Sequence, residues 1–235
     1  MKTPPVIAEI VGPSGAGKST LSAAINSIDC GIEAGLTVWG LPLISLAWST
    51  LLSAPDLLGL IWERKQFRQD ELKQVIRLGA FYRILTHKGA EAGSDHKAFL
   101  LDEGVVFALA KLRADIDSEF RSKRMRRWEE KALDRWSSIL STIIWMDAPD
   151  EVLIWRINNR AKQHRMKNSA EDSMREFLAR YRAAYVEVID KLKSRGKIQV
   201  IKFRTDELDP RAMVGEILAY CSGVGVSPKS PSALL

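Results

Sequence analysis

The stretch GPSGAGKST at residues 12–20 has the composition and spacing of a phosphate-binding loop. It matches the pattern G-x-x-x-x-G-K-[ST], with Gly12, Gly17, Lys18 and Ser19 at the defined positions. Glycines let the backbone curl until several N–H groups point at phosphate oxygens, and a helix that starts at the lysine adds its positive end. The lysine reaches the β- and γ-phosphates, and the hydroxyl after it binds Mg²⁺. ATP and Mg²⁺ are therefore the predicted ligands. The predicted nucleotide-binding residues of this loop are Gly12, Pro13, Ser14, Gly15, Ala16, Gly17, Lys18, Ser19 and Thr20.

An acidic pair ends a short apolar run in AFLLDEGVVF, residues 98–107. Carboxylates at the end of a buried strand are costly unless they meet a cation or a hydrogen-bond donor. If this strand lies beside the first one, Asp102 faces the phosphate loop and holds Mg²⁺ together with Ser19. Glu103 is then placed to orient or deprotonate an attacking hydroxyl. The alternative is that one or both carboxylates cap the helix that begins near Gly104.

Basic residues follow a second acidic turn in DAPDEVLIWRINNRAKQHR, residues 147–165. Arg156 and Arg160 are four residues apart, which places them on one face of a helix. Lys162 and Arg165 lead into a polar stretch that has the composition of a mobile lid. Because phosphoryl transfer needs cations at the moving phosphate, this segment is predicted to supply them, and a solvated basic helix is the alternative.

Short apolar runs alternate with helical patterns along the chain, which is typical of a parallel sheet covered by helices on both faces. Strands are expected at 6–11, 37–41, 98–101, 142–146 and 198–203. Helices are expected at 18–27, from the second strand to about 52, at 70–86, from 105 to 112 and beyond, and at 118–140, 151–163, 171–194 and 210–220. The predicted fold is an α/β, three-layer P-loop NTPase fold with a five-stranded parallel sheet. Residues 1–221 form the predicted domain with a lid at about 160–173, and 222–235 are predicted to be a disordered tail.

The segment 36–62 contains a single charged residue, Asp56. Its length would allow a membrane span, but Gly40, Pro42 and the lack of a basic flank argue against one. A buried strand followed by a buried helix is the favoured interpretation. The remaining alternative is an apolar groove for a hydrophobic substrate or a membrane surface.

The bulk composition limits the partners and the compartment. The chain has 235 residues, a net charge of +6 and two cysteines, Cys30 and Cys221, without metal-ligand spacing. These features favour an anionic ligand and a reducing, cytoplasmic compartment over a disulfide-bonded secreted protein. The basic run RSKRMRR at 121–127 is interpreted as a solvated helix and not as a nucleic-acid site, with Arg124 and Arg127 as alternative contacts for an acceptor phosphate. The three histidines, including His164, are interpreted as surface residues.

The chain resembles P-loop kinases of the thymidylate kinase and deoxynucleoside kinase group. The resemblance rests on the phosphate-binding loop, the acidic strand end, the Arg156-x-x-x-Arg160-x-Lys162 segment and the C-terminal pattern RYRAAYVEVIDKLKSRGKIQVIKF with RTDELDP after it. It implies a five-stranded parallel sheet, an Arg-bearing lid, ATP as donor and a fold compatible with a homodimer. It also implies that the loop after the last strand lies near the adenine. That loop holds Arg204, Thr205 and Asp206.

Two departures from this group affect the predicted acceptor. Those kinases carry an arginine close after the acid at the end of the third strand, where this chain has Glu103, and nucleoside kinases carry a glutamate after the second strand, where TVWGLPLISLAW has no acid. The sequence therefore predicts a kinase that moves the γ-phosphate of ATP to a small acceptor other than a nucleoside, such as a sugar, an antibiotic-like alcohol or a lipid-linked glycan. The alternatives are a (deoxy)nucleoside or nucleoside-monophosphate kinase and, from another class, a P-loop ATPase switch or a non-catalytic nucleotide-binding module. The predicted catalytic residues are Lys18, Asp102, Glu103, Arg156 and Arg160.

Overall fold

Five parallel strands form the central sheet, in the order β2-β3-β1-β4-β5. The computed structural model describes residues 5–28, 31–36, 69–90, 98–115 and 123–221. The strands are β1 (Val6–Val11), β2 (Ile32–Leu36), β3 (Ala98–Leu101), β4 (Thr142–Asp147) and β5 (Gln199–Arg204). Since β3 pairs with β1, the acidic pair that follows β3 lies at the same edge of the sheet as the loop that follows β1. The predicted fold class is confirmed.

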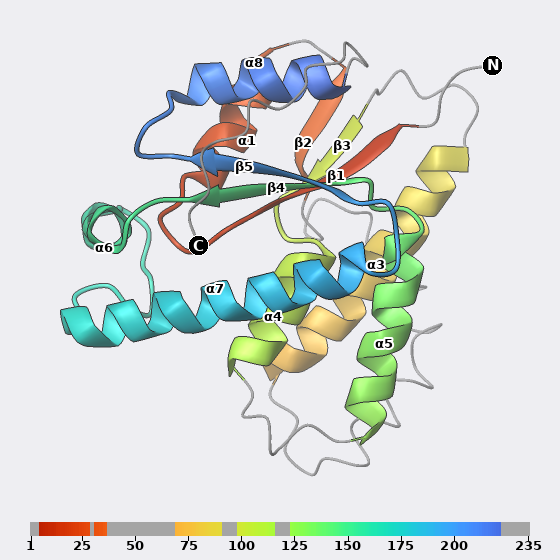
Figure 1. Cartoon of the computed structure of the whole chain (residues 1–235), viewed down its shortest axis with the longest axis horizontal. Helices are drawn as coiled ribbons and strands as arrows, with labels where there is room; N and C mark the ends of the chain where they lie inside the picture. The colour runs from red at the N-terminus through yellow and green to blue at the C-terminus, as the bar shows by residue number, and fades with distance from the viewer. Residues whose placement is uncertain (1–4, 29–30, 37–68, 91–97, 116–122, 222–235) are drawn as a thin grey trace.

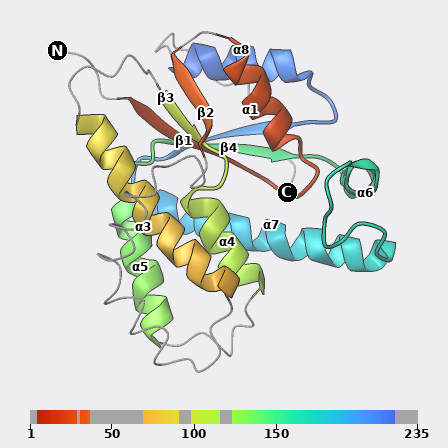
Figure 2. The same ribbon diagram turned by 180° about the vertical axis from the view of Figure 1, so that it is seen from behind.

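Helices cover both faces of the sheet and give the molecule three layers (Figure 1 and, from behind, Figure 2). Two helices lie on one face: α1 (Lys18–Asn26) and α8 (Pro210–Cys221). The opposite layer consists of α3 (Gln69–Ala90), α4 (Val105–Asp115), α5 (Lys123–Ser137) and α7 (Glu171–Lys193). The short helix α6 (Asp150–Asn159) lies beyond the carboxyl ends of the strands (Figure 1).

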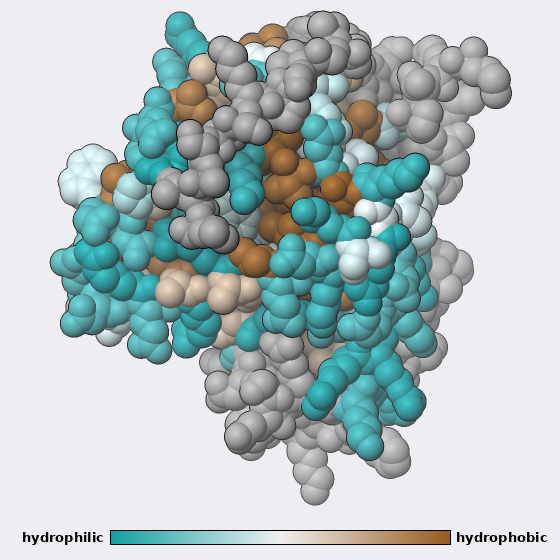
Figure 3. Space-filling model, in the orientation of Figure 1, coloured by the Kyte–Doolittle hydropathy of each residue, from teal (hydrophilic) through white to brown (hydrophobic). Residues whose placement is uncertain are grey.

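The core follows the apolar runs of the central strands. All four residues of β3 are buried, as are the last five residues of β1, because helices cover these strands on both faces. The edge strand β5 is less covered, since Val200 and Ile201 are only partly buried. Figure 3 shows apolar side chains gathered between the two helical layers, with hydrophilic side chains over α5 and over the two ends of α7.

The second strand does not lie where the sequence predicted it. The strand that pairs with β3 ends at Leu36, whereas the prediction placed a strand at 37–41. This strand forms the edge of the sheet and alternates, with Ile32 and Ala34 buried and Glu33 partly exposed. The prediction searched for an unbroken apolar run, which is typical of central strands only. Residues 37–62, including the predicted apolar helix, and the predicted tail at 222–235 lie outside the described residues.

Two helices are shorter than predicted. The helix expected at 151–163 ends at Asn159, because Arg160 has an extended backbone conformation, with φ −72° and ψ 144°. Arg156 and Arg160 therefore do not share a helical face, and that prediction was wrong. The helix expected at 118–140 ends at Ser137, and its expected start at 118–122 lies outside the described residues. Among the described residues, no helix is both long enough and apolar enough to cross a membrane.

Candidate active site

A cavity of about 630 Å³ opens at the carboxyl edge of the sheet, over the loop that joins β1 to α1. Five separate parts of the chain line it: this loop with the start of α1, the end of β3 with the start of α4, the end of β4, the end of α6 with the residues after it, and the turn after β5 with the start of α8. The polar and charged lining residues are Ser14, Lys18, Ser19, Thr20, Asp102, Glu103, Arg156, Arg160, Lys162 and Thr205.

The backbone of the phosphate-binding loop depends on its glycines. Gly12 has φ 146°, and a Cβ there would lie 1.9 Å from the carbonyl oxygen of Met146 on β4. Gly17 has φ 85° and precedes α1, which has no side-chain N-cap. The first N–H groups of α1 are therefore available at the cavity, and they and the helix dipole favour an anion there.

Lys18 lies beneath the loop with its ammonium group held by two backbone carbonyls. Its Nζ donates to the carbonyl oxygens of Gly12, at 2.8 Å, and Pro13, at 3.0 Å. Burial lowers the pKa of Lys18 to about 8, although the nearby carboxylates of Asp102 and Glu103 act in the opposite direction. The side chain is thus a part-buried cation at the position where a phosphate chain would enter.

Asp102 has one carboxylate oxygen to which none of the described residues donates a hydrogen bond. Its Oδ1 is buried and has no hydrogen-bond partner among the described residues. Burial raises the pKa of Asp102, while Lys18 acts to lower it. Asp102 and the hydroxyl of Ser19 line the same cavity, and oxygen ligands of this kind suit Mg²⁺. The donor set therefore fits the predicted metal.

Glu103 is paired with an arginine that the sequence did not indicate. Arg77 on α3 forms an ion pair with the Glu103 carboxylate, donates to Gln74 and lies over the ring of Phe107, 5.8 Å from its centroid. The acidic pair after β3 thus meets two cations, Lys18 and Arg77, that come from opposite sides of the sheet edge.

Glu9, in the middle of β1, holds the start of α4 in place. Its fully buried carboxylate accepts hydrogen bonds from the backbone N–H groups of Val106, at 2.9 Å, and Phe107, at 2.8 Å. Gly104 makes room for it, since a Cβ there would lie 2.6 Å from Glu9 Oε2. A side chain from another strand therefore caps this helix, and it fixes the turn that carries the acidic pair.

We expect Glu9 to give the free energy of unfolding a distinctive pH dependence. Burial raises the pKa of Glu9 from 4.5 to about 7 despite the hydrogen bonds from the α4 backbone. The unfolded chain therefore releases this proton first, and the stability that the neutral form contributes is lost as pH rises from about 4.5 through 7. Relative to Glu9→Gln, the wild type should therefore lose about 3 kcal/mol of unfolding free energy between pH 4.5 and 8. Urea unfolding of both proteins measures it, and parallel curves would contradict it.

Arg156 bridges the phosphate-binding loop and the turn after β5. Its guanidinium donates to the hydroxyl and the carbonyl oxygen of Thr205, both at 2.9 Å, and to the carbonyl oxygen of Gly15 at 3.3 Å. All three bonds are made within the protein, so the contacts of Arg156 are those of a brace between two walls of the cavity.

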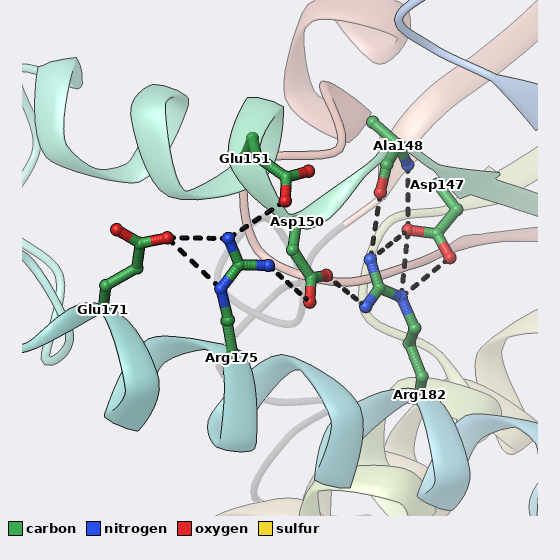
Figure 4. Close-up of polar contacts among 7 residues, drawn as sticks. All are labelled: Asp147, Ala148, Asp150, Glu151, Glu171, Arg175 and Arg182. Carbon is green, nitrogen blue, oxygen red and sulfur yellow. Dashed lines mark hydrogen bonds and ion pairs between the residues drawn. The ribbon is translucent and has the colours of Figure 1, made fainter.

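The acidic turn after β4 is held by two arginines of α7 (Figure 4). Arg182 pairs with Asp147, at 2.9 Å, and with Asp150, and it donates to the carbonyl oxygen of Ala148. Arg175 lies nearer the N-terminal end of the helix and pairs with Glu151, at 2.9 Å. These contacts fix α6, and with it the residues that lead into the cavity, against α7.

Comparison with solved structures gives matches over nearly the whole chain. A deoxyadenosine kinase from M. mycoides, with products dCMP and a flexible dCDP bound, is 17% identical with a TM-score of 0.52, over 92% of this chain and 99% of that chain. A thymidylate kinase from Candida albicans, whose structure is described as revealing the origin of its broad substrate specificity, is 11% identical with a TM-score of 0.56, over 94% and 93% of the two chains. No protein-family model and no curated protein sequence matches the chain. The chain has the fold of these P-loop kinases.

Within this P-loop kinase fold, most of the predicted site residues meet at the cavity. Lys18, Asp102 and Glu103 line it, and so do Arg156 and Arg160, although the two arginines differ in their surroundings. The Arg160 guanidinium makes no hydrogen bond or ion pair with any other described residue, so it is available to a ligand. Lys162, two residues further on, also lines the cavity.

Of the three residues predicted to lie near the adenine at the end of β5, only one lines the cavity. Thr205 lines the cavity, while Arg204 and Asp206 pair with each other at 2.9 Å. Arg124 and Arg127, the alternative contacts for an acceptor phosphate, lie exposed on α5 and are not part of the lining.

Proposed function

We propose that the protein is an ATP-dependent kinase that transfers the γ-phosphate of ATP to a nucleoside or a nucleoside monophosphate. The convergence of Lys18, Asp102 and Arg160 on one cavity over a phosphate-binding loop carries this proposal. The likeness in fold to a deoxyadenosine kinase and a thymidylate kinase supports the acceptor class. It favours this class over the sugar, antibiotic-like or lipid-linked acceptors predicted from the sequence.

The binding residues have separate roles in this proposal. Lys18 and the first N–H groups of α1 hold the phosphate chain, and the brace from Arg156 to Thr205 keeps the nucleotide side of the cavity in shape. Ser19 and Asp102 would hold Mg²⁺, which when bound neutralises phosphate oxygens. Arg160 and Lys162 supply positive charge at the γ-phosphate, where charge shifts during transfer.

Glu103 is the proposed base. An acceptor oxygen forms the new bond to the γ-phosphorus while the bond from that phosphorus to the β–γ bridging oxygen breaks, and ADP leaves. When the acceptor is a hydroxyl, its proton passes to the Glu103 carboxylate, which Arg77 orients from α3.

The position of Arg77 affects which acceptor class is predicted. The resemblance leads one to expect an arginine close after the acid at the end of the third strand, and Glu103 stands there instead. The structure nevertheless has a guanidinium beside that position, contributed by α3. The presence of Glu103 in place of the expected arginine is therefore a weaker argument against a nucleoside or nucleotide acceptor.

Transfer of label from γ-labelled ATP tests the proposal. The purified protein is incubated with Mg²⁺ and separate pools of deoxynucleosides, ribonucleosides and nucleoside monophosphates, and with pools of sugars, aminoglycosides and polyprenyl-linked glycans. We expect label in one of the first three pools and none with Lys18→Ala. Label only in a later pool would overturn the acceptor class, and label only as free phosphate would favour an ATPase.

The pKa of Lys18 predicts how the reaction responds to alkaline pH. The protonated ammonium attracts the phosphates, and kcat/KM for ATP reports the state of the enzyme before ATP binds. Because burial lowers the pKa of Lys18 to about 8, kcat/KM should fall about tenfold for each pH unit above 8. A pH profile from 6.5 to 10 at saturating acceptor measures this, and a flat profile up to pH 10 would contradict it.

A further inference from the structure

The segment between α6 and α7, residues 160–170, is tied down at several points although it forms no helix or strand. Lys167 Nζ donates to the carbonyl oxygen of Arg160 at 2.7 Å, within the segment itself. The Arg165 guanidinium pairs with Asp115 on α4 at 2.9 Å and lies 4.7 Å from the ring centroid of Phe177 on α7. Arg165 thus fixes one side of the segment to α4 and α7.

His164, the residue before Arg165, binds the phosphate-binding loop. Its Nδ1 accepts a hydrogen bond from the backbone N–H of Met166 at 3.2 Å, which leaves the ring proton of the neutral form on Nε2. Nε2 lies 3.0 Å from the hydroxyl of Ser14 and donates to it. The ring packs edge-on against Phe177, with the centroids 5.9 Å apart. The donor, the acceptor and the ring face all have partners.

We propose that His164 is a positioning residue: its hydrogen bond to Ser14 holds the 160–170 segment over the phosphate-binding loop. Arg160 and Lys162 line the cavity four and two residues before it, so fixing His164 restricts where these two cations can lie. Their action on a nucleotide phosphate rests on the proposed function, whereas the bond between His164 and Ser14 does not.

The surroundings of His164 favour its neutral form. Burial and the positive charges of Arg160, Arg165 and Lys18 lower its pKa. The acidic group on this side, Asp115, is engaged by Arg165 and by the Tyr181 hydroxyl, at 2.9 Å each. Protonation would remove the lone pair that accepts from Met166 and add another cation, so the contact weakens as the pH falls.

Limited proteolysis tests the contact without nucleotide or acceptor. Trypsin cleaves after the basic residues of the segment, and cleavage requires the segment to leave the loop. Because one hydrogen bond is lost, we expect cleavage to be about fivefold faster in Ser14→Ala and at least as fast in His164→Ala. His164→Gln, whose amide keeps a donor, should restore part of the protection. The matched control is Gln163→Ala, an exposed neighbour, which should be cleaved like the wild type.

The same variants test whether the contact positions the cations. Calorimetry with Mg²⁺ and ATPγS should give a Kd several-fold higher in Ser14→Ala and His164→Ala, intermediate in His164→Gln and unchanged in Gln163→Ala. Since glutamine does not titrate, the ratio of wild-type to His164→Gln cleavage rates should rise as the pH falls below the usual pKa of histidine. Wild-type cleavage rates in Ser14→Ala and His164→Ala would overturn the contact, and an unchanged Kd despite faster cleavage would overturn the positioning role. Neither readout depends on phosphate transfer, so a failure of the proposed kinase activity would be seen separately.

Discussion

Replacing Lys18 with methionine should lower kcat for phosphate transfer by about 10³-fold and leave the fold intact. The ammonium of Lys18 is fixed by two carbonyl oxygens of the phosphate-binding loop, at 2.8 and 3.0 Å, so it is preorganised before the nucleotide binds. Removing one such donor from a site where charge develops costs about 3–4 kcal/mol of transition-state stabilisation. Methionine keeps the apolar stem and removes a part-buried charge, so the free energy of unfolding should change little.

The measurement is kcat and KM for ATP with the best acceptor from the label-transfer assay, together with urea unfolding of the same protein. Lys202→Met makes the same chemical change at an exposed position of β5, and its kcat should equal that of the wild type. A Lys18→Met enzyme that keeps more than a tenth of the wild-type kcat would show that the lysine does not act on the transferred phosphate.

The parts of the site that the sequence predicted are those in which chemistry and local structure coincide. Gly12, Gly17 and Lys18 are contiguous with the end of β1, so one stretch carries both the backbone conformation and the charge. Asp102 follows a strand whose four residues are all buried, and a run of that kind is readily assigned to the centre of a sheet. Because β3 lies beside β1 in the sheet, Asp102 at the end of β3 lies at the same cavity as the loop after β1.

The residues that the sequence analysis missed act through long-range contacts. His164 and Ser14 are 150 residues apart, and Glu9 and Val106 are 97 apart. No periodicity links such pairs, and the scattered histidines gave no spacing signal. Glu9 could have been found from the sequence, because a carboxylate in an otherwise apolar strand must find hydrogen-bond donors when it is buried. Gly104, directly after the acidic pair, was a second indication, because it leaves room for the Glu9 side chain.

The boundary errors have a common cause in the surroundings of each element. The edge strand β2 buries alternate residues, so a search for continuous apolar runs passed over it. The end of α6 has no proline or glycine to mark it, and Arg160 instead turns into an extended conformation where Lys167 donates to its carbonyl oxygen. That turn separates a bracing arginine, Arg156, from one that is open to a ligand. This difference in surroundings determines the roles of the two arginines. The four-residue spacing in the sequence did not predict it.

Replacing Asp102 with asparagine should lower kcat by about 10²–10³-fold and raise the Mg²⁺ concentration needed for half-maximal rate. The buried Oδ1 of Asp102 has no partner among the described residues, and Mg²⁺ prefers a carboxylate to an amide. The free energy of unfolding, in contrast, should not decrease. Burial raises the pKa of Asp102, so the ionised group is disfavoured in the folded protein at neutral pH, and the neutral asparagine avoids that cost. The variant should therefore be at least as stable as the wild type in urea at pH 7.5.

This combination separates the metal-binding role from helix capping. Asparagine caps helices about as well as aspartate, so if Asp102 only capped α4, the substitution would leave kcat and its Mg²⁺ dependence unchanged. Rates are measured across a Mg²⁺ titration at fixed ATP, with Asp190→Asn, an exposed position on α7, as the matched control. A loss of activity with a shifted Mg²⁺ titration and undiminished stability indicates a carboxylate that is retained for chemistry at a cost to the fold. Replacing a residue kept only for packing would lower the stability as well, and replacing one kept only for capping would change neither quantity.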